Sequence, residues 1–182
     1  MFILASGSPR RKELLRKIVP EFTVIVSDVD ETLLHVPAKD LPAEESKAKA
    51  YAVFEKHPDD EVLACDTIVV LNGKPLGKPK DEEDAKAMLR AQSGKKEIVL
   101  SGYTYIRKGR EITRTVATAV YFNVLTEEQI ERYVREKKPL DKAGAYGIQD
   151  DYDLIEHIEG SYDNVMGFPT EDIYRHVILP GR

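Results

Sequence analysis

The run Val62–Leu71 most constrains the fold, because it is almost continuously apolar yet carries one carboxylate, Asp66, near its middle. Such a run, followed by the turn signal Asn72-Gly73, is typical of a buried β-strand that opens a hairpin. A carboxylate inside such a strand is costly unless it is ion-paired, hydrogen-bonded or bound to a metal. Asp66 is therefore the first candidate site residue.

The N-terminal segment predicts a strand, a tight turn and the start of a helix. An apolar run precedes Ser6–Arg11, in which Ser8 suits the N-cap and Pro9 the first helical position. Arg10 and Arg11 then fall in the first helical turn, where the helix dipole favours anions. Free backbone N–H groups, serine hydroxyls and two guanidinium groups indicate either a phosphate-binding turn or an ordinary cap with solvated arginines.

The rest of the chain alternates strand and helix patterns without an internal repeat or an obvious linker. The expected strands are 22–26, 62–71, 97–107, 111–124 and 154–160, and the expected helices are 42–56, 81–92, 126–137 and 170–177. A glycine-punctuated loop covers 142–150, and a second loop covers 161–169. This interleaving predicts a single mixed α/β domain over residues 1–182.

Composition narrows the class of protein. The 182 residues, with 42% hydrophobic and 32% charged side chains, describe a globular chain with a core. No apolar run approaches the roughly 20 residues of a membrane span and no signal-type segment precedes the first strand, so we expect a cytoplasmic protein with no membrane partner. The single cysteine, Cys65, excludes an internal disulfide and a multi-cysteine zinc site. A net charge of −5 argues against a nucleic-acid partner.

Three separated features suit one reaction class. They are the Ser6–Arg11 turn, the isolated carboxylates Asp30 and Asp66, and the lysines Lys47 and Lys78. Carboxylates hold Mg²⁺ or Mn²⁺ together with waters and substrate phosphates, and cations neutralise a polyphosphate as it is attacked. The combination predicts metal-assisted hydrolysis of a nucleotide. Taken singly, Asp30, Lys47 and Lys78 are explained better by a solvated turn or a charged helix face, and only Asp66 resists such an explanation.

Several segments, in order along essentially the whole chain, resemble the signature blocks of the Maf proteins, also called septum-formation-inhibitor proteins. The matching segments are Ile3–Leu15, Ala64–Thr67, Leu76–Pro79, Leu89 with Ser93-Gly94, and Lys142–Gln149. The resemblance implies a nucleoside triphosphate pyrophosphatase, which cleaves between the α- and β-phosphates and uses a divalent metal cation, Mg²⁺ or Mn²⁺. It also implies a homodimer, and a fold similar to that of the inosine triphosphate pyrophosphatases. That fold has an elongated mixed sheet flanked by helices, with two lobes around a cleft.

The resemblance further implies roles for single positions. Asp66 matches the general base and metal-associated carboxylate, and Asp30 falls where the family commonly has a glutamate associated with the metal. The phosphate-contacting positions match Ser8, Arg11, Lys47 and Lys78. The positions that separate the subgroup acting on dTTP and UTP match Arg10, Thr67 and Gln149. This pattern places the chain with that subgroup, with either a normal or a modified pyrimidine nucleotide as substrate in a house-cleaning role.

Two other functions fit parts of the sequence. The segment from Asp28 to Leu33 resembles the first motif of haloacid-dehalogenase-type phosphatases, with Asp28 as nucleophile and Asp30 as acid/base. That motif normally opens the fold, whereas here a complete strand, turn and helix come first. The second alternative is a non-catalytic, nucleotide-binding regulator of cell division, as the older family name suggests. The products formed from a nucleoside triphosphate separate the three: pyrophosphate, orthophosphate or none.

Overall fold

The computed structural model describes residues 1–29 and 35–181. The strands are β1 (Phe2–Leu4), β2 (Thr23–Val24), β3 (Glu61–Leu71), β4 (Lys74–Leu76), β5 (Lys96–Arg107), β6 (Arg110–Phe122) and β7 (Ile155–Glu159). The α-helices are α1 (Pro9–Arg16), α2 (Leu41–Phe54), α3 (Glu82–Gln92), α4 (Glu127–Lys137), α5 (Tyr162–Val165) and α6 (Thr170–Ile173). Two 3₁₀ turns, η2 (Ala143–Ala145) and η3 (Ile148–Asp150), and one π-helical turn, η4 (Tyr174–Ile178), complete the elements.

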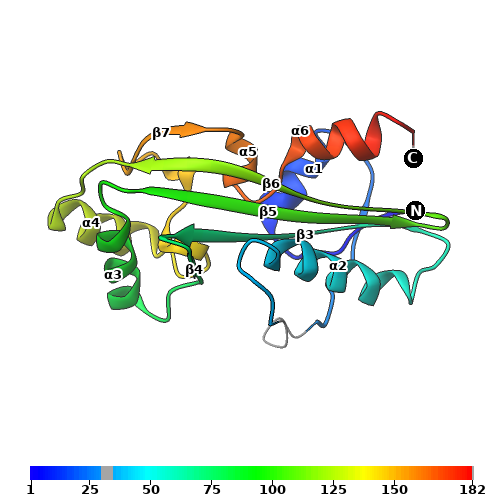
Figure 1. Cartoon of the computed structure of the whole chain (residues 1–182), viewed down its shortest axis with the longest axis horizontal. Coiled ribbons are helices and arrows are strands. Elements are labelled where there is room, and N and C mark those ends of the chain that lie inside the picture. The colour runs from blue at the N-terminus through cyan, green and yellow to red at the C-terminus, as the bar shows by residue number, and fades with distance from the viewer. Residues whose placement is uncertain (30–34, 182) are drawn as a thin grey trace. The chain divides into compact units, whose positions relative to one another are not determined.

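The strands form one mixed sheet, and helices flank it (Figure 1), so the expected mixed α/β class is confirmed. The strand order is β2-β1-β3-β5-β6-β7, and β4 pairs with β3. Strand β1 is parallel to both β2 and β3. Strand β4 is antiparallel to β3, and strand β7 is antiparallel to β6. Because β1 is parallel to β3 and Leu4 pairs with Leu63, the turn that follows β1 begins beside the part of β3 that leads to Asp66.

Most expected elements are present with ends shifted by a few residues, and three segments differ more. Only Thr23–Val24 of the expected strand 22–26 pairs, because β2 is the terminal strand of the sheet and pairs with β1 alone. The expected loop 161–169 contains α5, whose start is capped by the Ser161 hydroxyl. The last helix changes from α-helical to π-helical geometry after Ile173. Elements of two to five residues are too short for hydrophobic periodicity to define.

The described chain divides into two compact units. The first, unit 1, comprises Met1–Thr67, Leu100–Val116 and Gly167–Arg182, and the second, unit 2, comprises Ile68–Val99 and Ala117–Met166. The long strands β3, β5 and β6 each contribute residues to both units. Each unit is described below by itself.

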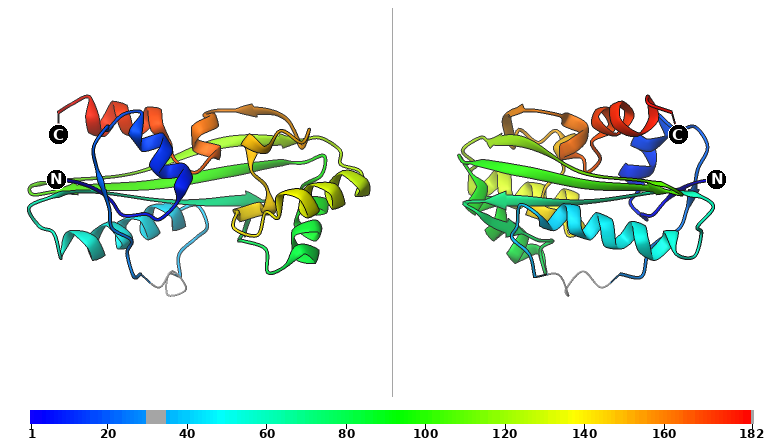
Figure 2. Two further views of the ribbon diagram at one scale, coloured as in Figure 1. Left: turned by 180° about the vertical axis from the view of Figure 1, so that it is seen from behind. Right: turned by 45° about the vertical axis from the view of Figure 1, so that its right-hand side comes forward.

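In unit 1, α2 covers one face of the sheet, and α1 and α6 cover the other (Figure 2). Gly102 of β5 lets α2 approach closely, because a Cβ atom there would lie 2.2 Å from the Pro42 carbonyl carbon. A buried hydroxyl pair, Ser46 Oγ and Thr104 Oγ1 at 2.9 Å, joins the same two elements. The position of α2 on the sheet is thereby fixed. The core of this region contains Ile3, Ala5, Ala50, Val53, Val62, Ala64 and Ile106.

In unit 2, α3 and α4 lie together on one face of the sheet. Helix α4 begins with a capping box, in which the Thr126 hydroxyl accepts from the Gln129 N–H group and the Gln129 side chain accepts from the Thr126 N–H group. Helix α3 begins at Asp81, whose carboxylate accepts from the Asp84 N–H group. The apolar faces of both helices join one core, which includes Leu89, Val99, Phe122, Ile130, Tyr133, Val134 and Tyr146.

Helix length and apolarity bear on membrane association. Over residues 1–29 and 35–181, the structure has no helix that is both long enough and apolar enough to span a bilayer.

Candidate active site

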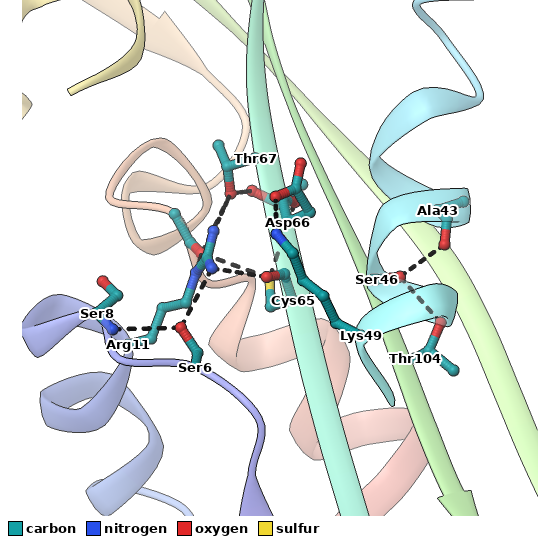
Figure 3. A network of polar contacts seen from close by, with 12 residues as sticks. Ser6, Ser8, Arg11, Ala43, Ser46, Lys49, Cys65, Asp66, Thr67 and Thr104 are labelled. Atoms are coloured by element: carbon teal, nitrogen blue, oxygen red, sulfur yellow. Dashed lines mark hydrogen bonds and ion pairs between the residues drawn. The ribbon is translucent and has the colours of Figure 1, made fainter. Parts of the chain in front are cut away.

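Asp66 lies in the middle of β3 and is buried, with 7% of its surface exposed. Its Oδ1 atom is 2.7 Å from the Nζ atom of Lys49, which α2 supplies (Figure 3). Both side chains are nearly enclosed, with 12% of Lys49 and 10% of Asp66 exposed. This ion pair is the compensation that a carboxylate inside an apolar strand requires, so the expectation that Asp66 is buried and paired is confirmed.

Arg11 ties the start of α1 to β3. Its Nε atom donates to the Gly167 carbonyl at 2.9 Å, and its Nη1 atom donates to the Cys65 carbonyl at 2.6 Å. Longer contacts reach Ser6 Oγ at 3.4 Å and Thr67 Oγ1 at 3.3 Å (Figure 3). A guanidinium group has five N–H donors. Within the described chain, four of these five donors are directed at the protein.

The Gly167 carbonyl is shared by three side chains. Besides Arg11, the Thr67 hydroxyl lies 3.2 Å from it and the Cys65 thiol 3.4 Å from it. Gly167 has a φ angle of +101°, a conformation that glycine adopts far more readily than other residues. Thr67 Oγ1 also lies 2.8 Å from Ser101 Oγ. The carbonyl of Gly167 therefore holds the side chains of Cys65 and Thr67, which precede and follow Asp66 in β3.

Cys65 is a core residue, as the sequence indicates. The thiol is fully buried, and burial raises its pKa to about 11, with the nearby Arg11 guanidinium acting in the opposite direction. A thiol with that pKa is protonated at neutral pH and is a poor nucleophile. Covalent catalysis by the cysteine is therefore not favoured by this environment.

The start of α1 has the predicted residues at the predicted positions, with Ser8 as N-cap and Pro9 as the first helical residue. The Ser8 side chain makes no capping hydrogen bond within the described chain. Its backbone N–H group donates instead to Ser6 Oγ at 3.3 Å. The first N–H groups of an α-helix have no acceptor within that helix. The Ser8 hydroxyl therefore lies at a helix start of the kind that binds anions.

Two further expected site residues, Lys78 and Gln149, belong to unit 2. Lys78 is exposed in the segment after β4, and Gln149 is exposed in η3. The Gly144 N–H group donates to the Gly77 carbonyl at 3.2 Å. This hydrogen bond ties the segment that carries Lys78 to the loop that carries Gln149.

A model of the family described as Maf-like protein matches residues 1–178. The chain belongs to this family. A relative from Bacillus mycoides (strain KBAB4), named dTTP/UTP pyrophosphatase, is 45% identical over 177 residues and covers 96% of this chain and 93% of its own length. A relative of the same name from Bacillus cytotoxicus is 44% identical over 178 residues, with 97% and 93% covered. The Ham1 protein of Staphylococcus aureus resembles this structure with a TM-score of 0.47 and 17% identity, over 66% of this chain and 71% of that chain.

In this Maf-like chain the partner of Asp66 is Lys49, a residue that the sequence analysis did not select. The selected lysine, Lys47, pairs with Glu111 at 3.1 Å on the exposed side of α2. The positions of the two lysines around the helix axis could have identified Lys49 as the buried one. With 3.6 residues per turn, Lys49 falls on the face that buries Ala50 and Val53, whereas Lys47 falls outside it.

The donor set around Asp66 is compatible with a divalent metal ion. Asp30, the second carboxylate expected there, lies outside the described residues. Within 1–29 and 35–181, no three histidine, cysteine or acidic side chains gather into a metal cage. Mg²⁺ commonly needs only one or two carboxylates, with waters and substrate phosphates completing its shell. Lys49 pairs with Oδ1 of Asp66, which makes Oδ2 the candidate ligand atom.

Proposed function

We propose that the protein is a nucleoside triphosphate pyrophosphatase that hydrolyses dTTP and UTP to the monophosphate and pyrophosphate. The observation that carries this proposal is the buried, ion-paired Asp66 in a chain of the Maf-like family. Relatives that cover nearly the whole chain are named dTTP/UTP pyrophosphatase, which supports the same substrates here.

In the proposed reaction, a water molecule cleaves the bond between the α- and β-phosphates, and Asp66 accepts a proton from that water. Lys49 holds the carboxylate in place from α2 and adds positive charge where the phosphates carry negative charge. A Mg²⁺ or Mn²⁺ ion held by Asp66 and Asp30 would neutralise charge on the phosphate oxygens. Arg11 acts mainly by holding the turn after β1 against β3, because most of its donors are already directed at the protein.

The remaining assignments complete the proposal. The phosphate groups are bound by side chains that donate hydrogen bonds or carry positive charge: Ser8, Arg11, Lys78 and, in the place expected for Lys47, Lys49, because Lys47 pairs with Glu111. The base is selected by Arg10, Thr67 and Gln149. We also propose one functional domain over residues 1–182, a cytoplasmic house-cleaning role, and a homodimer.

The phosphatase alternative is not favoured by any described feature. Asp28 is exposed, and it lies four residues beyond Val24, the last residue of the short terminal strand β2. An exposed carboxylate on irregular backbone lacks the fixed surroundings that activate a nucleophile. Asp30, the second residue of that motif, lies outside the described residues.

The test is to incubate the protein with a panel of nucleoside triphosphates and Mg²⁺ or Mn²⁺ and to identify the products. We expect pyrophosphate and monophosphate from dTTP and UTP in preference to the other nucleotides. Asp66→Asn should lower kcat about 10³-fold, because loss of a general base typically has an effect of that order. The matched control, Asp28→Asn, should keep wild-type activity. Orthophosphate as product, or full activity of a folded Asp66→Asn protein, would overturn the proposal.

A further inference from the structure

The hydroxyl group of Thr67, the residue that follows Asp66 in β3, has three polar neighbours. Its Oγ1 atom lies 3.2 Å from the Gly167 carbonyl oxygen, 3.3 Å from Arg11 Nη2 and 2.8 Å from Ser101 Oγ. Ser101 belongs to β5 and is fully buried. The four residues that meet at this hydroxyl all belong to unit 1. The proposed chemistry gives Ser101 no role.

Only one arrangement of hydrogen atoms satisfies all three contacts of the Thr67 hydroxyl. A hydroxyl group donates one hydrogen bond and accepts up to two. The Gly167 carbonyl can only accept and the Arg11 guanidinium can only donate, so the single hydrogen of Thr67 points to Gly167. Ser101 must then donate to Thr67. The Thr67 hydroxyl is thereby saturated, which leaves only the methyl group of this side chain for contact with the substrate base.

Strand β5 also holds the segment that carries the Gly167 carbonyl. Ser101 and Tyr103 are two residues apart in this strand, so their side chains point to the same face of the sheet. Tyr103 is fully buried, and its hydroxyl donates to Asp172 Oδ2 at 2.8 Å. Asp172 lies in α6, which begins three residues after Gly167. One strand therefore holds both Thr67 and the segment of its acceptor.

These hydrogen bonds lie on the face of β3 that is opposite to the Asp66 side chain. Successive side chains of a strand alternate, so those of Cys65 and Thr67 point away from the face that carries Asp66 and Lys49. Arg11, which contacts Thr67, also donates to the Cys65 carbonyl at 2.6 Å. The chain is therefore held just before and just after Asp66, while Lys49 holds the carboxylate itself (Figure 3).

We propose that Ser101 is a positioning residue for catalysis at Asp66. By donating to Thr67, it keeps the Thr67 hydrogen on the Gly167 carbonyl and so fixes the backbone around the general base. This inference rests on the proposed function, because it takes Asp66 as that base. The physical cause is that a hydroxyl hydrogen rotates to suit its partners. Without Ser101, the Thr67 hydroxyl can turn away from Gly167, and the contact with Arg11 loses its fixed geometry.

The first test compares kcat and KM for dTTP in the wild type, Ser101→Ala and Thr67→Val. Each variant removes one hydroxyl of the network, and valine keeps the branched shape of threonine. We expect each to lower kcat about tenfold and to change KM less than about twofold, because the base is misplaced while substrate binding is retained. The double variant should lose no more than about the same tenfold, because both changes break one network. Multiplied losses in the double variant would contradict the proposal.

The matched control is Thr104→Val. Thr104 lies three residues beyond Ser101 in β5 and is also fully buried, and its hydroxyl lies 2.9 Å from Ser46 Oγ. This variant removes a buried hydroxyl of the same kind on the other face of the sheet, so it should keep kcat within about twofold of the wild type. If Thr104→Val and Ser101→Ala lower kcat equally, the loss reflects general destabilisation and the proposal is wrong.

Nucleotide preference separates positioning from recognition of the base. If the Thr67 hydroxyl is saturated, the ratio of kcat/KM for dTTP to that for CTP should change less than about twofold in Thr67→Val. A hydroxyl that hydrogen-bonds the base would instead change this ratio by about tenfold or more. Thr67→Ser restores the hydroxyl and should regain most of the kcat lost in Thr67→Val. A changed ratio in Thr67→Val, or a Thr67→Ser protein no more active than Thr67→Val, contradicts the proposal.

A spectroscopic readout does not depend on activity. The Nε–H group of Arg11 donates to the Gly167 carbonyl at 2.9 Å, so its signal in a proton–nitrogen NMR spectrum should exchange slowly with water. This exchange should be about tenfold faster in Ser101→Ala and Thr67→Val and unchanged in Thr104→Val.

The two readouts distinguish the failure of this inference from the failure of the proposed function. If no nucleotide is hydrolysed but the exchange at Arg11 responds as expected, the proposed function fails and the hydrogen-bond network assigned to Ser101 stands. If nucleotides are hydrolysed, the proposal requires both kcat and the exchange to respond. A change in only one of them, or in neither, overturns the positioning role alone.

Discussion

The two buried polar clusters of this protein handle charge in opposite ways. Around Asp66, an ammonium and a guanidinium group from two helices meet a carboxylate and one backbone carbonyl of β3. Around Glu97, no cation of the described residues compensates the buried acid, and burial raises its pKa to about 8, so that it keeps its proton at neutral pH. The first cluster compensates charge with opposite charge, and the second removes the charge. The comparison shows that the free energy of unfolding contributed by the Glu97 cluster depends on pH. Glu97 avoids a buried negative charge by keeping its proton, whereas Asp66 pairs with a cation.

The largest expected effect is on the pH dependence of stability. Between the unfolded pKa of Glu97, 4.5, and its folded pKa, about 8, the folded protein keeps a proton that the unfolded chain has lost. The free energy of unfolding contributed by this group is therefore fully present below pH 4.5 and falls by about 5 kcal/mol as the pH rises to 8. Urea unfolding of wild type and Glu97→Gln at several pH values measures the difference. Parallel curves for the two proteins would show that Glu97 ionises normally when folded.

The next effect concerns the Asp66 cluster. Lys49→Met leaves a buried carboxylate without its cation, and breaking a buried pair in this way destabilises proteins by about 4 kcal/mol. The control is Lys47→Met, which breaks the exposed pair with Glu111 on the same helix. We expect no measurable shift of the urea midpoint for the control. Equal shifts for both variants would contradict the assignment of Lys49 as the buried partner.

A smaller effect is expected at Arg11. In Arg11→Lys one ammonium group replaces a planar fork that reaches the carbonyls of Cys65 and Gly167, so at least one carbonyl loses its partner. The cost should be about 3 kcal/mol in the free energy of unfolding. Arg16→Lys, in the exposed last turn of the same helix, is the control and should leave stability unchanged. A small effect at Arg11, equal to that of the control, would mean that its hydrogen bonds contribute little.

The smallest effect distinguishes a buried from an exposed tyrosine hydroxyl in unit 2. Tyr133→Phe removes the acceptor of the Gly147 N–H group and a donor to Asp150. We expect a loss of about 2 kcal/mol in thermal or urea unfolding, because a buried donor is left unpaired. The exposed hydroxyl of Tyr152 bonds to Glu136 on the surface, so Tyr152→Phe should have no measurable effect. If the two variants behave alike, Tyr133 does not hold residues 144–150.

Much of the fold follows from local sequence patterns. The capping residues Asp81 and Thr126 set the starts of α3 and α4, and the turns at Asn72-Gly73 and Lys108-Gly109 set the ends of long strands. Each of these signals acts within a few residues, so it can be seen in one sequence. The short helix α5 was not predicted, and the strand expected at 22–26 is limited to Thr23–Val24, because four residues and two residues are too few for a sequence pattern to define.

The sequence by itself determined that Asp66 is buried in a strand, that Ser8 and Pro9 begin a helix, and that the segments of a Maf-like chain occur in order. Only the tertiary structure decided that Lys49 is the partner of Asp66 and that Ser101 contacts Thr67. The physical reason is range. The patterns that indicate burial and helix capping are formed by residues adjacent in the chain. The partner of a buried charge, in contrast, comes from a distant segment that only folding brings close.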